Sequence, residues 1–180
     1  MSLRSKLGRQ IEELIGALDR LNVRYALIGG LALAPHHVIR ATQDIDLLIG
    51  AADATAADQE LSRLGYRCLH RSEDAANYAR ADERVDVLYA RRPAALRLLD
   101  GARELTTALG PLRVVSAEGL IGFKLQAFVN NPRRTQDLED IRALIRANGD
   151  TLDRVELRNY FQLFGRSALL EEILRDLSPS

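Results

Sequence analysis

Tyr25-Ala-Leu-Ile-Gly-Gly-Leu-Ala-Leu33 and, after a loop, Arg40-Ala-Thr-Gln-Asp-Ile-Asp-Leu-Leu-Ile49 are the two stretches that decide the fold. The first predicts a short strand over 24–28 that ends in Gly29-Gly30 and is followed by a small helix from Leu31. Glycines after a strand permit backbone conformations closed to other residues and let the main chain approach a ligand closely. Because a helix N-terminus attracts anions, this stretch predicts a phosphate cradle.

The second stretch predicts a strand with one acidic face. In a strand, residues i and i+2 share a face, and a rise of about 3.3 Å per residue places their stems roughly 6.6 Å apart. The apolar residues at 45, 47 and 49 can therefore enter a core, while Asp44 and Asp46 point the other way. Unpaired neighbouring carboxylates are costly to bury, so we expect their face to be wet or to hold a cation.

A third carboxylate follows in the stretch Arg84-Val-Asp-Val-Leu-Tyr89, where apolar residues alternate with Asp86. If this strand pairs beside the one that carries Asp44 and Asp46, the three acids share one surface. Such a surface can hold two metal ions about 3.5 to 4 Å apart and support phosphoryl or nucleotidyl transfer. Oxygen ligands favour Mg2+ or Mn2+.

These motifs resemble a known superfamily. Gly29-Gly30, Asp44-Ile-Asp46 and the lone strand Asp86 are similar to the polymerase-beta-type nucleotidyltransferases. Over roughly residues 24–145, the Gly-Gly-Leu-Ala and Arg-Ala-Thr-Gln-Asp-Ile-Asp runs, Lys124 and Asp137-Leu-Glu-Asp140 resemble the AbiEii-like nucleotidyltransferases of toxin–antitoxin systems. The resemblance implies an α/β (α+β) nucleotidyltransferase fold, a mixed β-sheet flanked by helices with a helical C-terminal segment.

The resemblance also implies a reaction and its partners. A nucleoside monophosphate would pass from an NTP to a hydroxyl acceptor on RNA, tRNA or protein, with Mg2+ or Mn2+ as cofactor and an antitoxin as a further partner. Two alternatives stay open: a catalytically silent nucleotide- or partner-binding module, and an enzyme that modifies a small molecule such as an antibiotic. The presence of all three acids in this chain favours an enzyme, because a pure binding module needs no metal triad.

Each candidate residue receives a role. Asp44 and Asp46 are expected to hold metal shared with the triphosphate, and Asp86 to hold the catalytic metal and to act as base. Lys124 lies among apolar neighbours, so it either extends to water or meets an anion; the resemblance implies a phosphate contact. Of the acids that open the next helix, which the helix dipole alone would favour, Asp137 is preferred to Asp140.

The glycine pair, Gly29 and Gly30, is expected to contact the nucleotide through its main chain. Many members of the superfamily carry serine at the second position, so at Gly30 a hydroxyl contact to phosphate is missing. Backbone N–H groups must then bind the phosphate.

Composition and length are ordinary for a cytoplasmic globular protein. The chain has 180 residues, a net charge of zero and 47% hydrophobic residues, with no apolar run long enough for a membrane span. We expect a nucleotidyltransferase core over 1–115 and a helical segment over 116–180. The only cysteine, Cys68, is expected to be a buried hydrophobe in a strand.

Periodicity predicts the remaining elements. Apolar residues from Leu3 to Leu21 recur at three- and four-residue steps and predict a first helix. Further helices are expected at 53–64, 93–100, 116–128, 134–147, 151 or 153–164, and 168–177, and further strands at 66–70, 77–80 and 112–115.

Overall fold

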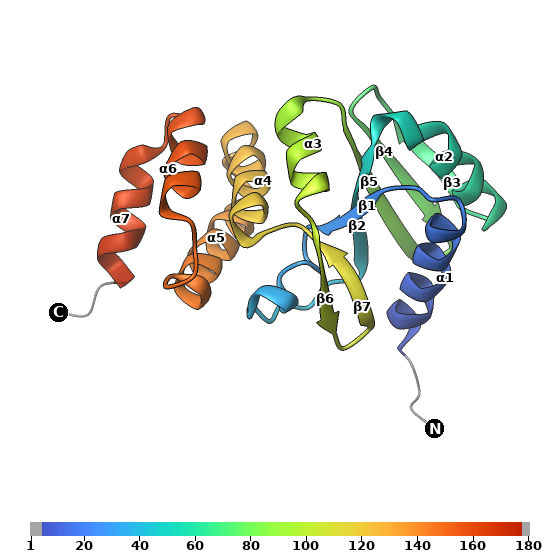
Figure 1. Cartoon of the computed structure of the whole chain (residues 1–180), viewed down its shortest axis with the longest axis horizontal. Coiled ribbons are helices and arrows are strands. Elements are labelled where there is room, and N and C mark those ends of the chain that lie inside the picture. Colours follow the sequence, from blue (N-terminus) through green and yellow to red (C-terminus); the bar gives the residue numbers. More distant parts are fainter. Residues whose placement is uncertain (1–4, 178–180) are drawn as a thin grey trace. The chain divides into compact units, whose positions relative to one another are not determined.

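Seven strands form one mixed sheet among residues 5–177, the part of the chain that this computed structural model describes (Figure 1). The sheet order is β3-β4-β5-β2-β1-β7-β6. Strands β2 and β5 run parallel, as do β1 and β7, and the other neighbours are antiparallel. The strands are β1 (Tyr25–Ile28), β2 (Asp44–Gly50), β3 (Arg67–Arg71), β4 (Ala75–Arg80), β5 (Glu83–Ala90), β6 (Arg103–Thr107) and β7 (Gly110–Val114).

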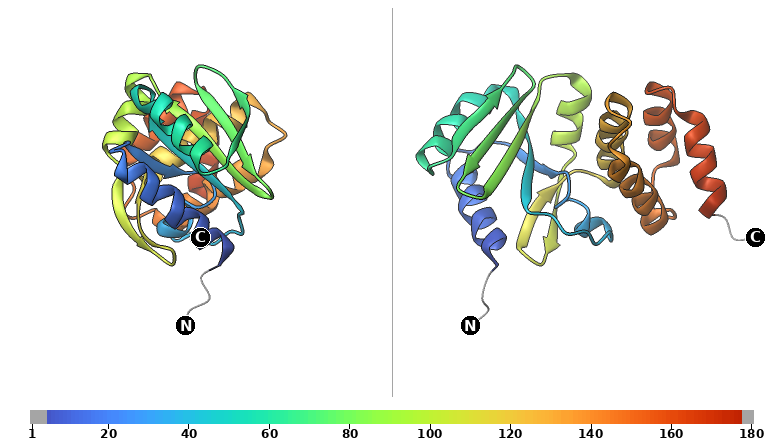
Figure 2. Two further views of the ribbon diagram at one scale, coloured as in Figure 1. Left: turned by 90° about the vertical axis from the view of Figure 1, so that its right-hand side faces the viewer. Right: turned by 180° about the vertical axis from the view of Figure 1, so that it is seen from behind.

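Three helices flank this sheet. Figures 1 and 2 show α1 (Lys6–Arg20) and α2 (Ala54–Arg63) on one face and α3 (Pro93–Asp100) on the other. Helix α1 forms because its apolar residues fall on one side, and that side is buried in the core. The first predicted helix is thus confirmed from Lys6 onward, while Leu3 lies outside the described residues. The predicted α/β fold with a mixed, helix-flanked sheet is also confirmed.

The chain separates into two compact units. The first contains the sheet and comprises the described residues up to Ala32 together with Arg40–Val115. The second comprises Leu33–Ile39 and the described residues from Ser116 onward. Segment 33–39 joins the helical unit because Asn148 Nδ2 donates a hydrogen bond of 2.8 Å to the main-chain oxygen of His36.

The second unit is helical, as expected. Its elements are the 3-10 turn η1 (Ala34–His36) and the helices α4 (Ala117–Asn130), α5 (Thr135–Asn148), α6 (Arg154–Leu163) and α7 (Ser167–Leu177). Two of the predicted helices begin at side-chain caps: the Ser116 hydroxyl accepts from the amide of Gly119 at 3.0 Å, and the Asp153 carboxylate accepts from the amide of Val155 at 2.8 Å.

Three local predictions were wrong. The helix expected from Leu31 is replaced by turns and the single 3-10 turn η1, which ends at His37 in a left-handed conformation with φ of 64°. Strand β6 was not predicted, because Arg-Glu-Leu-Thr-Thr contains only one large apolar residue; β6 pairs with β7 and forms one edge of the sheet. Cys68 is exposed instead of buried because it lies on the opposite edge strand, β3.

Candidate active site

The parallel pairing of β2 with β5 brings the three predicted acids to one face of the sheet. Asp46 pairs with Asp86, and Asp44 pairs with Arg84. Neighbouring strands lie about 4.8 Å apart, and paired residues point to the same side. Asp44 is exposed, and Asp46 and Asp86 are half-buried. The structure therefore meets the condition set by the sequence pattern, that the two acid-bearing strands lie side by side.

Asn77 is a neighbour of the acids that the sequence analysis did not identify. Strand β4 pairs antiparallel with β5 so that Asn77 lies opposite Asp86, and Asn77 Nδ2 donates to Asp86 Oδ1 at 2.7 Å. This bond orients the carboxylate of Asp86. The sequence signal is the position of Asn77 between the apolar residues Ala76 and Tyr78, which in a strand places Asn77 on the opposite face. Both neighbours are buried in the structure.

The glycine pair lies directly against this acid row. Gly29 has φ of 65°, and a Cβ atom added there would stand 2.0 Å from Asp46 Oδ2. A Cβ atom at Gly30 would stand 2.8 Å from the hydroxyl oxygen of Thr42. Neither position can take a side chain without movement of its neighbours. The missing side chain at position 29 is what allows the carboxylate of Asp46 to approach the main chain.

The described residues contain no group of three or more His, Cys, Asp or Glu side chains that could hold a metal ion by itself. The acid row nevertheless fits a hard cation. Mg2+ is usually held by one or two carboxylates together with substrate phosphates and water. Within the described part of the chain, neither Asp44 nor Asp86 forms an ion pair with a lysine or arginine. Their oxygens thus match the donor set that Mg2+ or Mn2+ prefers.

Lys124 and Asp137 belong to a second charged cluster, inside the helical unit. Lys124 Nζ lies 2.6 Å from Asp140 Oδ2 and 3.3 Å from Asp137 Oδ1, and 6% of its side chain is exposed. Arg134 Nε reaches the other oxygen of Asp137 at 2.6 Å. Lys124 therefore meets anions within the protein instead of extending to water. A contact of Lys124 or Asp137 with a nucleotide stays a prediction, and Asp140 is the acid nearer to the lysine.

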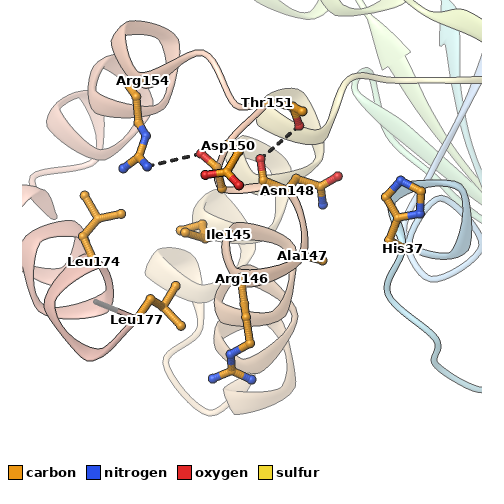
Figure 3. A pocket seen from close by; sticks show the side chains of 11 residues that line it. His37, Ile145, Arg146, Ala147, Asn148, Asp150, Thr151, Arg154, Leu174 and Leu177 are labelled. Atoms are coloured by element: carbon orange, nitrogen blue, oxygen red, sulfur yellow. Dashed lines mark hydrogen bonds between the residues drawn. The ribbon is translucent and has the colours of Figure 1, made fainter. Parts of the chain in front are cut away.

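A cavity of about 460 Å3 lies elsewhere in the helical unit (Figure 3). Arg146, Asp150 and Arg154 contribute charged side chains to its wall, and Leu174 and Leu177 contribute apolar ones. Arg154 donates to the main-chain oxygen of Gly149 at 3.2 Å. None of the residues predicted to bind metal or nucleotide lines this cavity.

Residues 3–175 match a protein family described as "Uncharacterised nucleotidyltransferase". The chain belongs to this family. The nucleotidyltransferase assignment from the sequence motifs is thereby confirmed, and the chain is an enzyme of this class. The finer resemblance to AbiEii-like proteins is not confirmed. No curated protein matches the chain.

Solved structures show the same fold as this nucleotidyltransferase. The solution structure of the antibiotic-resistance factor ANT(2'')-Ia is 19% identical, with a TM-score of 0.71 over 97% of this chain and 100% of that one. Its crystal structure with adenylyl-2''-tobramycin is 20% identical, with a TM-score of 0.72 over 89% and 98%. The lincosamide adenylyltransferase LnuA, bound to lincomycin, is 16% identical, with a TM-score of 0.57 over 76% and 94%.

None of the described helices combines the length and the apolar composition that crossing a membrane requires.

Proposed function

We propose that this nucleotidyltransferase transfers a nucleoside monophosphate from an NTP to a hydroxyl acceptor in a metal-dependent reaction. The observation that carries the proposal is the in-register pair Asp46 and Asp86, on a solvent-reaching face and directly beside the main chain of Gly29. Carboxylates side by side need a cation to relieve their repulsion. A triphosphate held against the glycine pair would bring its own negative charge to the same place.

Each residue has a part in the reaction. Asp44, Asp46 and Asp86 would hold Mg2+ or Mn2+, which when bound supplies positive charge to the transferring phosphorus and the leaving pyrophosphate. Gly29 and Gly30 would offer main-chain N–H groups to the phosphates. Asp86, oriented by Asn77, would accept the proton as the acceptor oxygen bonds to the α-phosphorus and the bond to pyrophosphate breaks. Lys124 and Asp137 are proposed to support nucleotide binding from the helical unit.

The proposal is tested by incubating the protein with each α-labelled NTP, Mg2+ and three sets of acceptors: cellular RNA, protein, and small molecules that include tobramycin and lincomycin. We expect pyrophosphate release together with transfer of label to one acceptor class. The Asp44→Ala, Asp46→Ala double variant should abolish both. The matched control is Asp74→Ala, an exposed acid in the turn between β3 and β4. Absence of transfer and of Mg2+-dependent NTP binding would contradict the proposal and favour a silent partner-binding module.

A second candidate is adenylyl transfer to an antibiotic. The observation that favours it is the match over nearly the whole chain to ANT(2'')-Ia, whose crystal structure contains adenylyl-2''-tobramycin. Label on tobramycin or lincomycin in the same assay would establish it.

A toxin role with an antitoxin partner rests on the motif resemblance alone. It predicts that expression of the chain arrests growth and that the Asp44→Ala, Asp46→Ala double variant does not. Growth curves of the two strains decide this point.

A further inference from the structure

The face of the sheet that carries the acids also carries arginines. We call the side of β3, β4, β5 and β2 that contains Asp44, Asp46 and Asp86, opposite the side that α1 and α2 cover, the acid face. Strand pairing places Arg84 beside Asp44, Ala79 beside Arg84, and Arg67 beside Ala79. Paired residues share a face, so both arginines lie on the acid face, in the row next to Asp46 and Asp86.

Arginines on the two faces of these strands differ in their partners. On the opposite face, Arg71 pairs with Asp58, and Arg80 pairs with Glu13 and with Glu83. On the acid face, Arg84 donates to the main-chain oxygens of Ala81 and Glu83 at 3.1 Å and 2.8 Å.

Neither Arg84 nor Arg67 forms an ion pair with a carboxylate within residues 5–177, and both side chains are exposed. The acid face thus holds two guanidinium charges that the described protein does not neutralise, whereas the face covered by α1 and α2 holds none among these four arginines. An exposed, uncompensated arginine beside a reaction site is available to an anionic ligand.

The acids on this face do not cancel that charge during the reaction. Asp44, Asp46 and Asp86 are the proposed metal ligands, so their charge would be offset by the cation. The stem of Arg84 lies about 4.8 Å from that of Asp44, and Arg67 lies two strands beyond Arg84, roughly 10 Å from it and about 14 Å from Asp44. These separations suit a ligand whose hydroxyl reaches Asp86 while a phosphate several bonds away accepts hydrogen bonds from the guanidinium group of Arg84 or Arg67.

We propose that Arg67 and Arg84 bind the acceptor, and that the acceptor carries phosphate. This inference rests on the proposed transfer reaction and adds the chemical class of its second substrate. A cationic acceptor such as an aminoglycoside would instead be repelled by both guanidinium groups. The phosphate could belong to an RNA chain that ends in a free hydroxyl or to a free nucleoside monophosphate, and the experiment separates these sources.

The experiment measures binding of a fluorescent single-stranded RNA oligonucleotide by anisotropy, with competition by a nucleoside 5'-monophosphate and by tobramycin. We expect the R67E/R84E double variant to bind the oligonucleotide about tenfold or more weakly, with a shallower dependence on salt. The control is Arg103→Glu, which reverses the charge of an exposed arginine on β6, at the opposite edge of the sheet. R67Q/R84Q, with thermal melts, shows that the loss follows charge and not unfolding.

If the monophosphate displaces the oligonucleotide, and this displacement depends on Arg67 and Arg84, the acceptor is a ligand with a single phosphate. If the oligonucleotide binds and the monophosphate does not displace it, the acceptor is an RNA chain. Both outcomes support the proposal. RNA affinity of R67E/R84E equal to that of Arg103→Glu, or a preference for tobramycin, overturns it. Mg2+-dependent NTP binding is measured on the same proteins: its absence in the wild type contradicts the transfer reaction, whereas its retention with unaltered RNA binding in R67E/R84E contradicts only this inference.

Discussion

The two units hold neighbouring acids in opposite ways. In the sheet, Asp46 and Asp86 lie side by side on a half-buried face, and the partner of Asp86 is the neutral amide of Asn77. In the helical unit, Asp137 and Asp140 are buried and share the ammonium group of Lys124. Breaking a buried ion pair is expensive, while half-buried acids tolerate a polar or wet environment. The comparison separates the acids whose ion pairs link α4 to α5 from the acids that we propose to bind a cation.

The strongest test of this contrast is Asp86→Asn. The substitution keeps the size of the side chain and removes the proposed base and metal ligand, so we expect kcat to fall about 10²- to 10⁴-fold. The melting temperature should change little, because no cation of the described protein depends on Asp86. Rates of pyrophosphate release and thermal melts measure both quantities, with Asp74→Asn as the control acid. A large loss of stability with modest loss of rate would reverse the assignment.

The opposite result is expected for Lys124→Met. It leaves two buried carboxylates without their shared cation, and we expect the free energy of unfolding to fall by about 3–5 kcal/mol. Adding Asp140→Asn should recover much of this loss, because Asp137 keeps its contact with Arg134. Urea titrations give the stabilities. If the double variant is stable but its KM for NTP is raised, Lys124 also contacts the nucleotide; an unchanged KM limits it to a structural role.

Gly29→Ala is expected to reduce both stability and activity. The new methyl group would meet Asp46 at a backbone position with positive φ, at a cost of about 1–3 kcal/mol. Displacement of Asp46 by roughly 1 Å should also lower activity about 10²-fold. Gly165→Ala is the matched control, since Gly165 has φ of 64° with nothing within 4 Å of an added Cβ. Equal activity in both variants would show that Asp46 does not need its place beside Gly29.

The smallest effect is expected at Glu156, a partly exposed acid on α6. Burial raises the pKa of its carboxyl, and the nearby carboxylates of Glu118 and Asp153 raise it further, against the bond from Tyr160. The folded state therefore keeps the proton to a higher pH than the unfolded state does. Ionisation of Glu156 then lowers the free energy of unfolding as the pH rises above the ordinary pKa range of a glutamate. Glu156→Gln should gain at most about 0.5 kcal/mol at pH 7. Melts between pH 4 and 7 should show a gain that grows with pH; a gain at pH 4 alone would contradict this sign.

Much of the candidate site followed from local sequence patterns. Alternation around Asp44, Asp46 and Asp86 predicted two strands with acidic faces, because a side-chain period of two is a property of the strand itself. The glycine pair marked the turn, where Gly29 indeed has positive φ. The helix after Gly30 was not predictable in this way, since Pro35 and the left-handed His37 shape a turn whose residues pack with α5.

By itself, the sequence determined the fold class, the two acid-bearing strands and the nucleotidyltransferase assignment, but not the finer family. Only the tertiary structure decided which residues meet. Pairing of β2 with β5, segments about forty residues apart, revealed that Asp46 lies opposite Asp86 and that Arg84 lies beside Asp44. Pairing of β5 with its other neighbour, β4, revealed that Asn77 bonds Asp86. The burial of Lys124 between two aspartates was likewise decided by the tertiary structure. Helix periodicity predicts which face of a helix is buried, but it does not predict which helix packs against that face.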